Sequence, residues 1–405
     1  MKTGNIAIVS HVNPFSSGSG QVQRVYNTLL ALALDWNRII IYTLEAKQSN
    51  PERENRIIQL NPGVQIKYLQ QSSWLKLLKP VFYFLPYLGF GKPSNWILPF
   101  IFKQLVKQDF KQYDCVLFEY WYLYKLAGKI KSPETMVVCD THNILLGSFK
   151  EYIWSKKLPA FYKKYLVNRY RYLEFNKALK NSFDALIAIN KEEEAIYKNQ
   201  FPGKKILYCP MGVKLPAYFP AKIDKPKGSY TVAYYGGLSN PRNTAAAIQV
   251  YTALIKSSQF ENKNFAYKII GSNPPKVLSN LVLSNPAITL TGFVEDLSTV
   301  LSDVDLAVIP FEGKFGFRSR IIELMYFGIP VLTSPDAVWG MGFTAGVNIF
   351  NYNPGDDIAN EIMRLLNDRD NRERVACNAK KYVEQEFTFE ATYKNLSKEL
   401  KQLAS

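Results

Sequence analysis

The sequence predicts an α/β protein with two domains, each built on a sheet of buried strands. The chain has 405 residues, which is long for a single hydrophobic core. Short apolar runs alternate with helical patterns in both halves of the chain. The alternation restarts at Thr231, after a segment rich in Pro and Lys that lacks periodicity. We therefore expect one domain at 1–213, a linker at 214–230 and a second domain at 231–388.

The first domain is expected to begin with a strand. Its apolar run at 6–9 is too short for a signal peptide and fits a buried strand instead. Further apolar runs of similar length follow at intervals that leave room for helices between them. We expect strands at 5–10, 38–44, 64–69, 114–119, 136–143, 185–189 and 205–208, helices at 21–34 and 191–199, and a basic helical stretch at 150–180.

The second domain repeats the pattern. An apolar run ends at Pro310, a loop with several glycines follows, and apolar residues then recur at helical spacing until Gly328 and Pro330 end the helix. We expect strands that begin at Thr231, Ala266, Ile288, Asp305 and Val331, and helices at 244–257, 321–326, 357–366, 371–384 and 389–403.

Charge is distributed unevenly along the chain. The formal net charge is +16, and residues 1–210 hold 29 Lys and Arg against 15 Asp and Glu. The four cysteines, Cys115, Cys139, Cys209 and Cys377, lie far apart and form no C-x-x-C pair. This spacing favours neither a disulfide framework nor a zinc site. We therefore expect a reducing, cytoplasmic environment.

Two basic segments, at 74–111 and 150–180, also hold many aromatic residues. Aromatic side chains interleaved with lysines suit an anionic membrane surface, where rings lie at headgroup depth and each cation adds about 1 kcal/mol. Prolines at 80, 86, 93 and 99 argue against a helix that crosses the membrane. The alternative is that these aromatic residues pack an ordinary core. Nucleic acid is not the expected partner, because arrays of solvent-facing Arg are missing.

The loop and helix at 316–323 hold the charges that point most directly to a ligand. Arg318 and Arg320 lie around the first turn of the predicted helix, where unpaired N–H groups and the helix dipole attract phosphate. Glu323, one turn later, is suited to accept hydrogen bonds from ribose hydroxyls. Two cations and one carboxylate in this order indicate a nucleotide-sugar site. The alternative is a solvated helix face.

The sequence GFRSRIIE at 316–323, with GIPV at 328–331, resembles the donor-site motif of the retaining glycosyltransferases of family four. The resemblance spans nearly the whole chain and implies the GT-B fold. That fold is α/β, with two Rossmann-like domains facing each other across a cleft and a C-terminal helix, here 389–405, that crosses back to the first domain. Another common form of the motif has a glutamate where this chain has Phe315.

The resemblance assigns donor-binding roles to two glycine-rich loops. Gly18, Ser19 and Gly20 follow the first strand, at the edge of the sheet where ligands bind in such folds. In the second domain, Gly236 and Gly237 allow close approach of the backbone to a ligand. Arg242 stands at the position of the family's lysine and can reach a phosphate.

The same resemblance assigns roles to three more residues and to Gly316, which opens the motif. His142 lies in an Asp-x-His-Asn element at a strand end and is expected to face the donor sugar. On spacing alone, His142 could equally be a histidine satisfied by local hydrogen bonds, and His11 is a weaker candidate. Phe293 and Val294 lie in the segment whose backbone borders the nucleotide base. Phe293 could instead belong to the core.

The predicted function is therefore a retaining transfer of a sugar from a nucleoside diphosphate sugar to a hydroxyl. We expect His142, Arg318 and Arg320 to be catalytic and no metal or other cofactor to take part. The expected acceptor is a polysaccharide or a lipid-linked glycan, and the expected location is the inner face of the cytoplasmic membrane, with the protein bound peripherally. Two alternatives stay open: a nucleotide-sugar epimerase of the same fold, and a non-catalytic GT-B partner protein associated with membrane.

Overall fold

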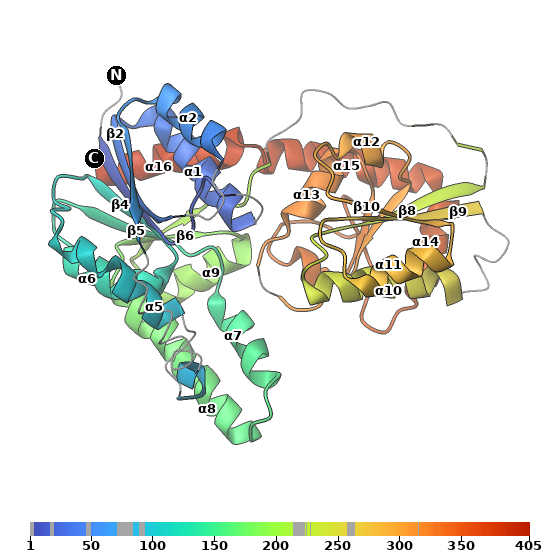
Figure 1. Cartoon of the computed structure of the whole chain (residues 1–405), viewed down its shortest axis with the longest axis horizontal. Helices are drawn as coiled ribbons and strands as arrows, with labels where there is room; N and C mark the ends of the chain where they lie inside the picture. Colours follow the sequence, from blue (N-terminus) through green and yellow to red (C-terminus); the bar gives the residue numbers. More distant parts are fainter. Residues whose placement is uncertain are drawn as a thin grey trace. The chain divides into compact units, whose positions relative to one another are not determined.

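The computed structural model describes residues 4–16, 20–45, 50–70, 84–88, 94–213, 223, 225–226, 228–256, 264–314 and 316–405. They form two compact units, one drawn from Met1–Gly212 and Phe389–Ser405, the other from Val213–Lys314 and Arg318–Thr388. Each unit has its own sheet, whose strands are all parallel (Figure 1). This architecture confirms the predicted α/β class.

The first sheet has seven strands in the order β3-β2-β1-β4-β5-β6-β7. The order reverses beside β1, as in doubly wound Rossmann-like domains. The carboxyl ends of β1 and β4 therefore flank the point where ligands bind in such sheets. The strands are β1 (Asn5–Ser10), β2 (Arg38–Leu44), β3 (Val64–Leu69), β4 (Cys115–Glu119), β5 (Met136–Asp140), β6 (Ala185–Ala188) and β7 (Lys205–Tyr208).

Helices cover both faces of this sheet, because successive strand residues point to opposite sides. Ile6 and Ile8 of β1 are buried in one hydrophobic cluster, and Ala7 and Val9 are buried in the other. The helical elements are α1 (Gly20–Asp35), α2 (Pro51–Leu60), η1 (Leu85–Leu88), α5 (Ser94–Ile101), η2 (Phe102–Lys107), η3 (Trp121–Leu123), α6 (Tyr124–Ile130), α7 (Leu145–Trp154), α8 (Ala160–Arg171), the π-helix η4 (Tyr172–Leu179) and α9 (Lys191–Gln200).

The C-terminal segment returns to the first unit, as predicted. It consists of a π-helical turn, η7 (Glu390–Lys394), and α16 (Asn395–Ala404). Tyr393, Leu396 and Leu400 are buried in the cluster that also contains Ile6 and Ile8. The Lys401 ammonium donates a 2.9 Å hydrogen bond to the Asp35 carbonyl at the end of α1.

The second sheet has six strands in the order β10-β9-β8-β11-β12-β13, so its order reverses between β8 and β11. Figure 1 shows its helices on both sides of the strands. The strands are β8 (Ser229–Tyr235), β9 (Asn264–Ile270), β10 (Ile288–Gly292), β11 (Leu306–Ile309), β12 (Val331–Thr333) and β13 (Phe350–Asn351). The helices are α10 (Pro241–Lys256), α11 (Lys276–Ser284), α12 (Ser298–Leu301), α13 (Ser319–Tyr326), η6 (Pro335–Val338), α14 (Ile358–Asn367) and α15 (Arg369–Glu386).

The differences from the predicted elements have identifiable causes. The helix expected from residue 244 begins at Pro241, whose fixed φ suits a first helical turn. Helix α2 was not predicted, because Ile57 is its one buried residue and no apolar stripe marks it. Within the described residues, no helix is both long and apolar enough to span a membrane.

Candidate functional site

The second unit places Arg318 at the start of α13, beside the carboxyl end of β11. Arg318 occupies the N-cap position and has no capping side-chain bond there. Its guanidinium carbon lies 3.2 Å from the centroid of the Phe311 ring, which is a close cation–π contact. Arg318 is only 9% exposed. The aromatic ring thus fixes a cation beside the unpaired N–H groups of a helix N-terminus.

Arg320, on the first turn of α13, reaches across to the loop after β8. Its Nη1 donates a 2.8 Å hydrogen bond to Asn243 Oδ1 and lies 3.4 Å from the Tyr234 hydroxyl. A Cβ at Gly236 would overlap with the same Nη1 atom. Gly236 is therefore required for this guanidinium to lie against the loop, and Arg320 Nε stays buried without a hydrogen-bond partner among the described residues.

Glu323 lies one turn further along α13, next to the end of β8. The Tyr235 hydroxyl donates a 2.8 Å hydrogen bond to Glu323 Oε2. Burial raises the pKa of Glu323, while hydrogen bonds from Tyr235 and Ser319 act in the opposite direction. The carboxyl group is thus held in one orientation, at the sheet edge where Arg320 also lies.

The other residues predicted for the donor site are arranged less closely. Gly237 is exposed on the loop between β8 and α10, and Arg242 is exposed on the first turn of α10, where the Asn243 amide donates a hydrogen bond to the Gly237 carbonyl. Phe293 is 78% exposed, so it does not belong to the core, and Val294 is partly buried beside it. Gly316 has a φ of +73°, a conformation that favours glycine. No described contact joins Phe293 to the arginines.

In the first unit, the predicted His142 belongs to a buried polar cluster at the carboxyl ends of β4 and β5. His142 Nε2 and Glu119 Oε2 are 2.5 Å apart, and the two side chains are 3% and 0% exposed. Glu119 and Asp140 are register partners on neighbouring strands. Asp140 Oδ1 also accepts a 3.2 Å hydrogen bond from the His142 backbone N–H. The imidazole is therefore held between two strand ends.

Arg24 of α1 neutralises Asp140. Arg24 Nε and Nη2 donate to the two Asp140 carboxylate oxygens at 2.8 and 3.0 Å. Both residues are fully buried. A bidentate pair of this kind is geometrically specific, so it fixes the start of α1 relative to β5.

The backbone on both sides of the cluster is strained. Tyr120 has a φ of +71° and His142 a φ of +56°, although neither residue is a glycine. Their rings stack with centroids 4.0 Å apart. Such conformations cost on the order of 1–3 kcal/mol and concentrate at functional sites.

His11 follows β1 and packs edge-on against Tyr120 and Tyr122, at centroid distances of 5.1 and 5.4 Å. Desolvation by burial, with repulsion from His142, lowers the pKa of His11 to about 4. His11 is therefore a neutral imidazole at pH 7. From the sequence, His11 was a weaker candidate than His142, and its position beside the cluster was not predicted.

Glu119, Asp140 and His142 are the described residues whose ligand atoms lie close enough together to hold a metal ion. Several of their donor atoms are already engaged, since Arg24 binds both oxygens of Asp140 and His142 Nε2 binds Glu119 Oε2. A cation bound by Asp140 would have to compete with the Arg24 guanidinium. The donor set therefore fits a charge-paired polar cluster better than a metal centre, and the metal-free reaction stays a prediction.

Of the first glycine-rich loop, Gly18 and Ser19 lie outside the described residues. Gly20 opens α1, and a Cβ there would meet the Met211 methyl group at 3.4 Å, an ordinary contact. The phosphate-binding role of the loop stays a prediction.

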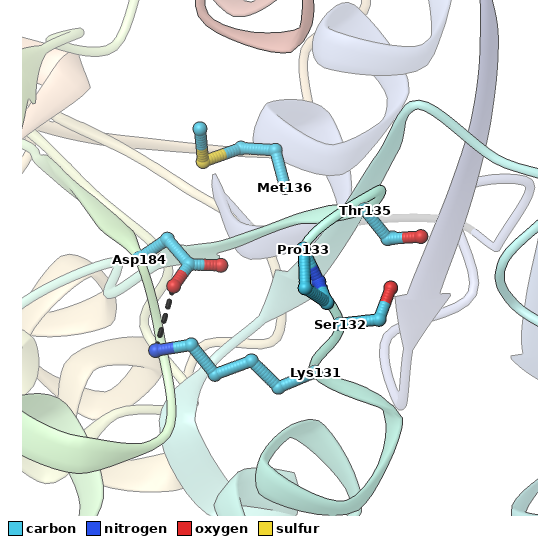
Figure 2. A pocket seen from close by; sticks show the side chains of 6 residues that line it. All are labelled: Lys131, Ser132, Pro133, Thr135, Met136 and Asp184. Atoms are coloured by element: carbon cyan, nitrogen blue, oxygen red, sulfur yellow. Dashed lines mark ion pairs between the residues drawn. The ribbon is translucent and has the colours of Figure 1, made fainter.

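A cavity of about 530 Å³ lies elsewhere in the first unit. Figure 2 shows the Lys131 ammonium paired with Asp184, 2.6 Å apart, across this cavity. Met136 begins β5 and Asp184 precedes β6, so the cavity lies at the amino edge of the sheet. It is therefore at the opposite edge from the His142 cluster.

Sequence reasoning missed the partners that orient the predicted residues. In the first unit, Glu119 contacts His142 and Arg24 binds Asp140. In the second unit, Tyr235 bonds Glu323 and Asn243 bonds Arg320. One signal was present, because Glu119 is the single charged residue in the strand CVLFE. A charge in a buried strand needs a partner.

Comparison with known proteins gives the class of the molecule. Residues 229–368 match the family described as "Glycosyl transferases group 1". A search with the sequence finds no significant match among curated proteins. Among solved structures, the chain is similar to sucrose-phosphate synthase from Thermosynechococcus elongatus, with 18% identity, a TM-score of 0.66 and 99% of each chain covered.

Two further structures show the same fold. Anabaena HepE, solved with UDP and glucose, is 14% identical with a TM-score of 0.63 and coverage of 98% of this chain and 100% of that one. WaaG, a glycosyltransferase of lipopolysaccharide biosynthesis, is 12% identical with a TM-score of 0.63 and coverage of 98% and 99%. The fold is thus that of the GT-B glycosyltransferases. More particularly, residues 229–368 of the second unit match the group 1 glycosyltransferase family, in agreement with the predicted resemblance.

Proposed function

We propose that the protein transfers a sugar, with retention of configuration, from a nucleoside diphosphate sugar to a hydroxyl acceptor. The observation that carries the proposal is the arrangement on α13 of a group 1 glycosyltransferase domain. Two partly buried guanidinium groups at the helix start are followed, one turn later, by an oriented carboxyl group. Solved relatives of the same fold include HepE in complex with UDP and glucose, which supports a nucleotide-sugar donor.

Each side chain has a distinct role in this proposal. Arg318 and Arg320, with the N-terminus of α13, neutralise the diphosphate as it departs, which is the main stabilisation of charge in the transition state. Arg242 adds a further cation. Glu323 accepts hydrogen bonds from the ribose hydroxyls. His142 faces the donor sugar, and Phe293 and Val294 border the base.

The proposed route to retention is chosen from the groups available. A covalent intermediate requires a carboxylate on the far face of the sugar, and the sequence offers no confident candidate for it. Attack by the acceptor on the face from which the diphosphate departs needs only the positive charge that stabilises the leaving group. We therefore propose front-face transfer without a metal ion or other cofactor.

The donor can be identified by thermal shift with UDP-, GDP-, ADP- and dTDP-linked sugars, followed by transfer assays. Replacing Arg318 or Arg320 by Ala is expected to cost at least about 2 kcal/mol in transition-state binding, because a charge-assisted contact is lost. Anomeric configuration in the product, read by NMR, tests retention. Wild-type turnover by both variants would show that the diphosphate lies elsewhere.

The two alternatives give different outcomes in the same assays. An epimerase converts the donor without any acceptor, which mass spectrometry of the nucleotide sugar detects. A non-catalytic partner protein is folded but binds no nucleoside diphosphate in calorimetry.

We further propose that the first unit binds an anionic membrane surface, where a lipid-linked or polysaccharide acceptor is assembled on the cytoplasmic side. Within the basic segment at 150–180, the core interpretation holds for Tyr170 and Phe175, which are buried. Trp154, Phe161 and Tyr172, on α7, α8 and η4, are 50%, 77% and 56% exposed. Exposed rings among lysines suit a headgroup layer.

Co-sedimentation with vesicles tests this surface. We expect the wild-type protein to bind vesicles that contain anionic lipid and to be released by salt. The double variant W154A/F161A should bind less, whereas L283A, which removes an 86% exposed side chain from the second unit, should bind as the wild type does. Equal binding by all three proteins would contradict the proposal.

A further inference from the structure

We infer that Glu119 is a positioning residue for His142: it holds the imidazole through Nε2 and so keeps Nδ1 as an N–H donor toward the sugar. The inference adds a residue to the proposed transfer reaction. It rests on the proposed function only for the identity of the group, the sugar, that accepts the hydrogen bond from Nδ1–H. It assigns a role to a residue that the donor-site motifs do not include.

The geometry fixes the imidazole at one nitrogen. Glu119 Oε2 lies 2.5 Å from Nε2, a short hydrogen bond that leaves a single proton between the two atoms. The ring of Tyr120 covers one face of the imidazole, with the planes 16° apart. No described residue provides a hydrogen bond to Nδ1, the nitrogen on the other side of the ring. Nδ1 is therefore the atom left for a ligand.

Counting protons gives the state of Nδ1. Burial raises the pKa of Glu119, because a charged carboxylate is poorly solvated there. A buried pair without net charge is favoured, and it exists in two forms. Either a carboxylate faces an imidazolium, or a carboxylic acid faces a neutral imidazole. In both forms the proton not shared with Glu119 is on Nδ1.

The charges around the pair do not change this count. Arg24 and Asp140 neutralise each other at 2.8 Å. His11 is neutral at pH 7, since desolvation lowers its pKa to about 4. The groups that face the pair are Arg24 from α1, Asp140 from β5, His11 after β1 and Tyr120 after β4.

Backbone strain on both sides of the ring is independent support. Tyr120 and His142 end adjacent strands with positive φ values, and Tyr120 combines a φ of 71° with a ψ of 147°, a region that is essentially restricted to glycine. A conformation this costly persists where the surroundings impose it. Here it accompanies the stack of the two rings, one of which contacts Glu119 through Nε2.

Nuclear magnetic resonance of ¹⁵N-labelled histidine tests the inference without any substrate. The chain has two histidines, so a H11Q variant assigns the remaining signals to His142. At pH 7 we expect the His142 Nδ1 resonance of a protonated ring nitrogen. A resonance of an unprotonated Nδ1 would overturn the inference.

Kinetics of E119Q test the consequence for turnover. The amide keeps the shape of Glu119 but can either donate or accept a hydrogen bond, so it no longer fixes which nitrogen of the imidazole carries the proton. We expect kcat to fall about ten-fold or more with KM for the donor little changed, since the lost hydrogen bond acts in the transition state. An unchanged kcat, or a fall in kcat matched by a rise in KM for the donor, would contradict the inference.

The matched control is D184N, which makes the same change from acid to amide at the opposite edge of the same sheet. D184N should keep the wild-type kcat and the wild-type KM for the donor. If the wild-type protein transfers no sugar, the proposed function fails, but the Nδ1 resonance still decides the role of Glu119. If E119Q does not fold, as judged by circular dichroism, the wild-type resonance remains sufficient.

Discussion

Tyr235 and Glu323 form a 2.8 Å hydrogen bond that joins β8 to α13 in the second unit. The phenol is the donor and the carboxyl oxygen the acceptor. This contact holds the acid proposed to bind ribose, and it brings the last residue of a central strand against the helix that also carries Arg320. Helix α13 is thus tied to the sheet through the residue that is proposed to bind ribose.

Replacing Tyr235 by Phe removes this donor from a partly buried carboxyl group. We expect a loss of about 1–3 kcal/mol in the free energy of unfolding, measured by urea denaturation, because the acceptor is left with one bond fewer. Y251F is a suitable control, since the described residues provide no hydrogen bond to the Tyr251 hydroxyl. Equal stability of Y235F and Y251F would show that the bond is not maintained in solution.

A side chain at Gly236 is predicted to displace the Arg320 guanidinium. A G236A substitution places a methyl group where Arg320 Nη1 lies, so the guanidinium must move away from Asn243. We expect the affinity for the nucleoside diphosphate to fall about ten-fold, the value of one charged hydrogen bond, as measured by calorimetry.

Gly237 gives the matched comparison for folding. A Cβ at Gly237 meets nothing within 4 Å, so G237A should keep the melting temperature of the wild-type protein. If G236A bound nucleotide as tightly as the wild type, Arg320 could not be a diphosphate ligand in the position that the structure gives it.

Breaking the pair between Arg24 and Asp140 should be costly. D140N leaves the Arg24 guanidinium buried without a counter-charge, for which losses of about 3–5 kcal/mol are typical. D303N breaks the ion pair between Lys268 and Asp303, whose side chains are 19% and 24% exposed, respectively. This substitution is expected to cost about 1 kcal/mol or less. Urea denaturation of both variants measures the contrast. Similar losses would mean that the Arg24 pair is solvated in solution.

The grouping of charged side chains at α13 was predictable because these residues are close together in the sequence. Arg318, Arg320 and Glu323 fall on one helix, and helical spacing alone places them on neighbouring turns. Their orientation was not predictable, because Tyr235 and Asn243 come from segments more than 70 residues away, at separations of 88 and 77 residues. Contacts of that kind depend on how strands are ordered in the sheet.

The first-unit cluster shows the same limit. The Asp-x-His-Asn sequence identifies a strand end and a histidine, and both are present at β5. Glu119 lies 23 residues before His142, and the two meet only because β4 and β5 are neighbours in register. The role of Arg24 could not be predicted either, since the apolar pattern of its helix does not mark Arg24 as buried.

The buried Glu193 predicts how stability depends on pH. Glu193 lies in the first turn of α9 and is 1% exposed. Desolvation by burial raises the pKa of Glu193 from 4.5 to about 8. Between these two pH values the folded state keeps a proton that the unfolded state has released. The free energy of unfolding contributed by this group is therefore full below about pH 4.5 and is lost as the pH rises toward 8.

The E193Q variant removes this titration, because an amide cannot ionise at any of these pH values. We expect the wild-type protein to lose stability relative to E193Q as the pH rises from 5 to 8, and the difference to level off above pH 8. Urea denaturation of both proteins across this range measures it. A constant difference between the two proteins would mean that Glu193 ionises in the folded state as readily as in the unfolded chain, and hence that water reaches its carboxyl group.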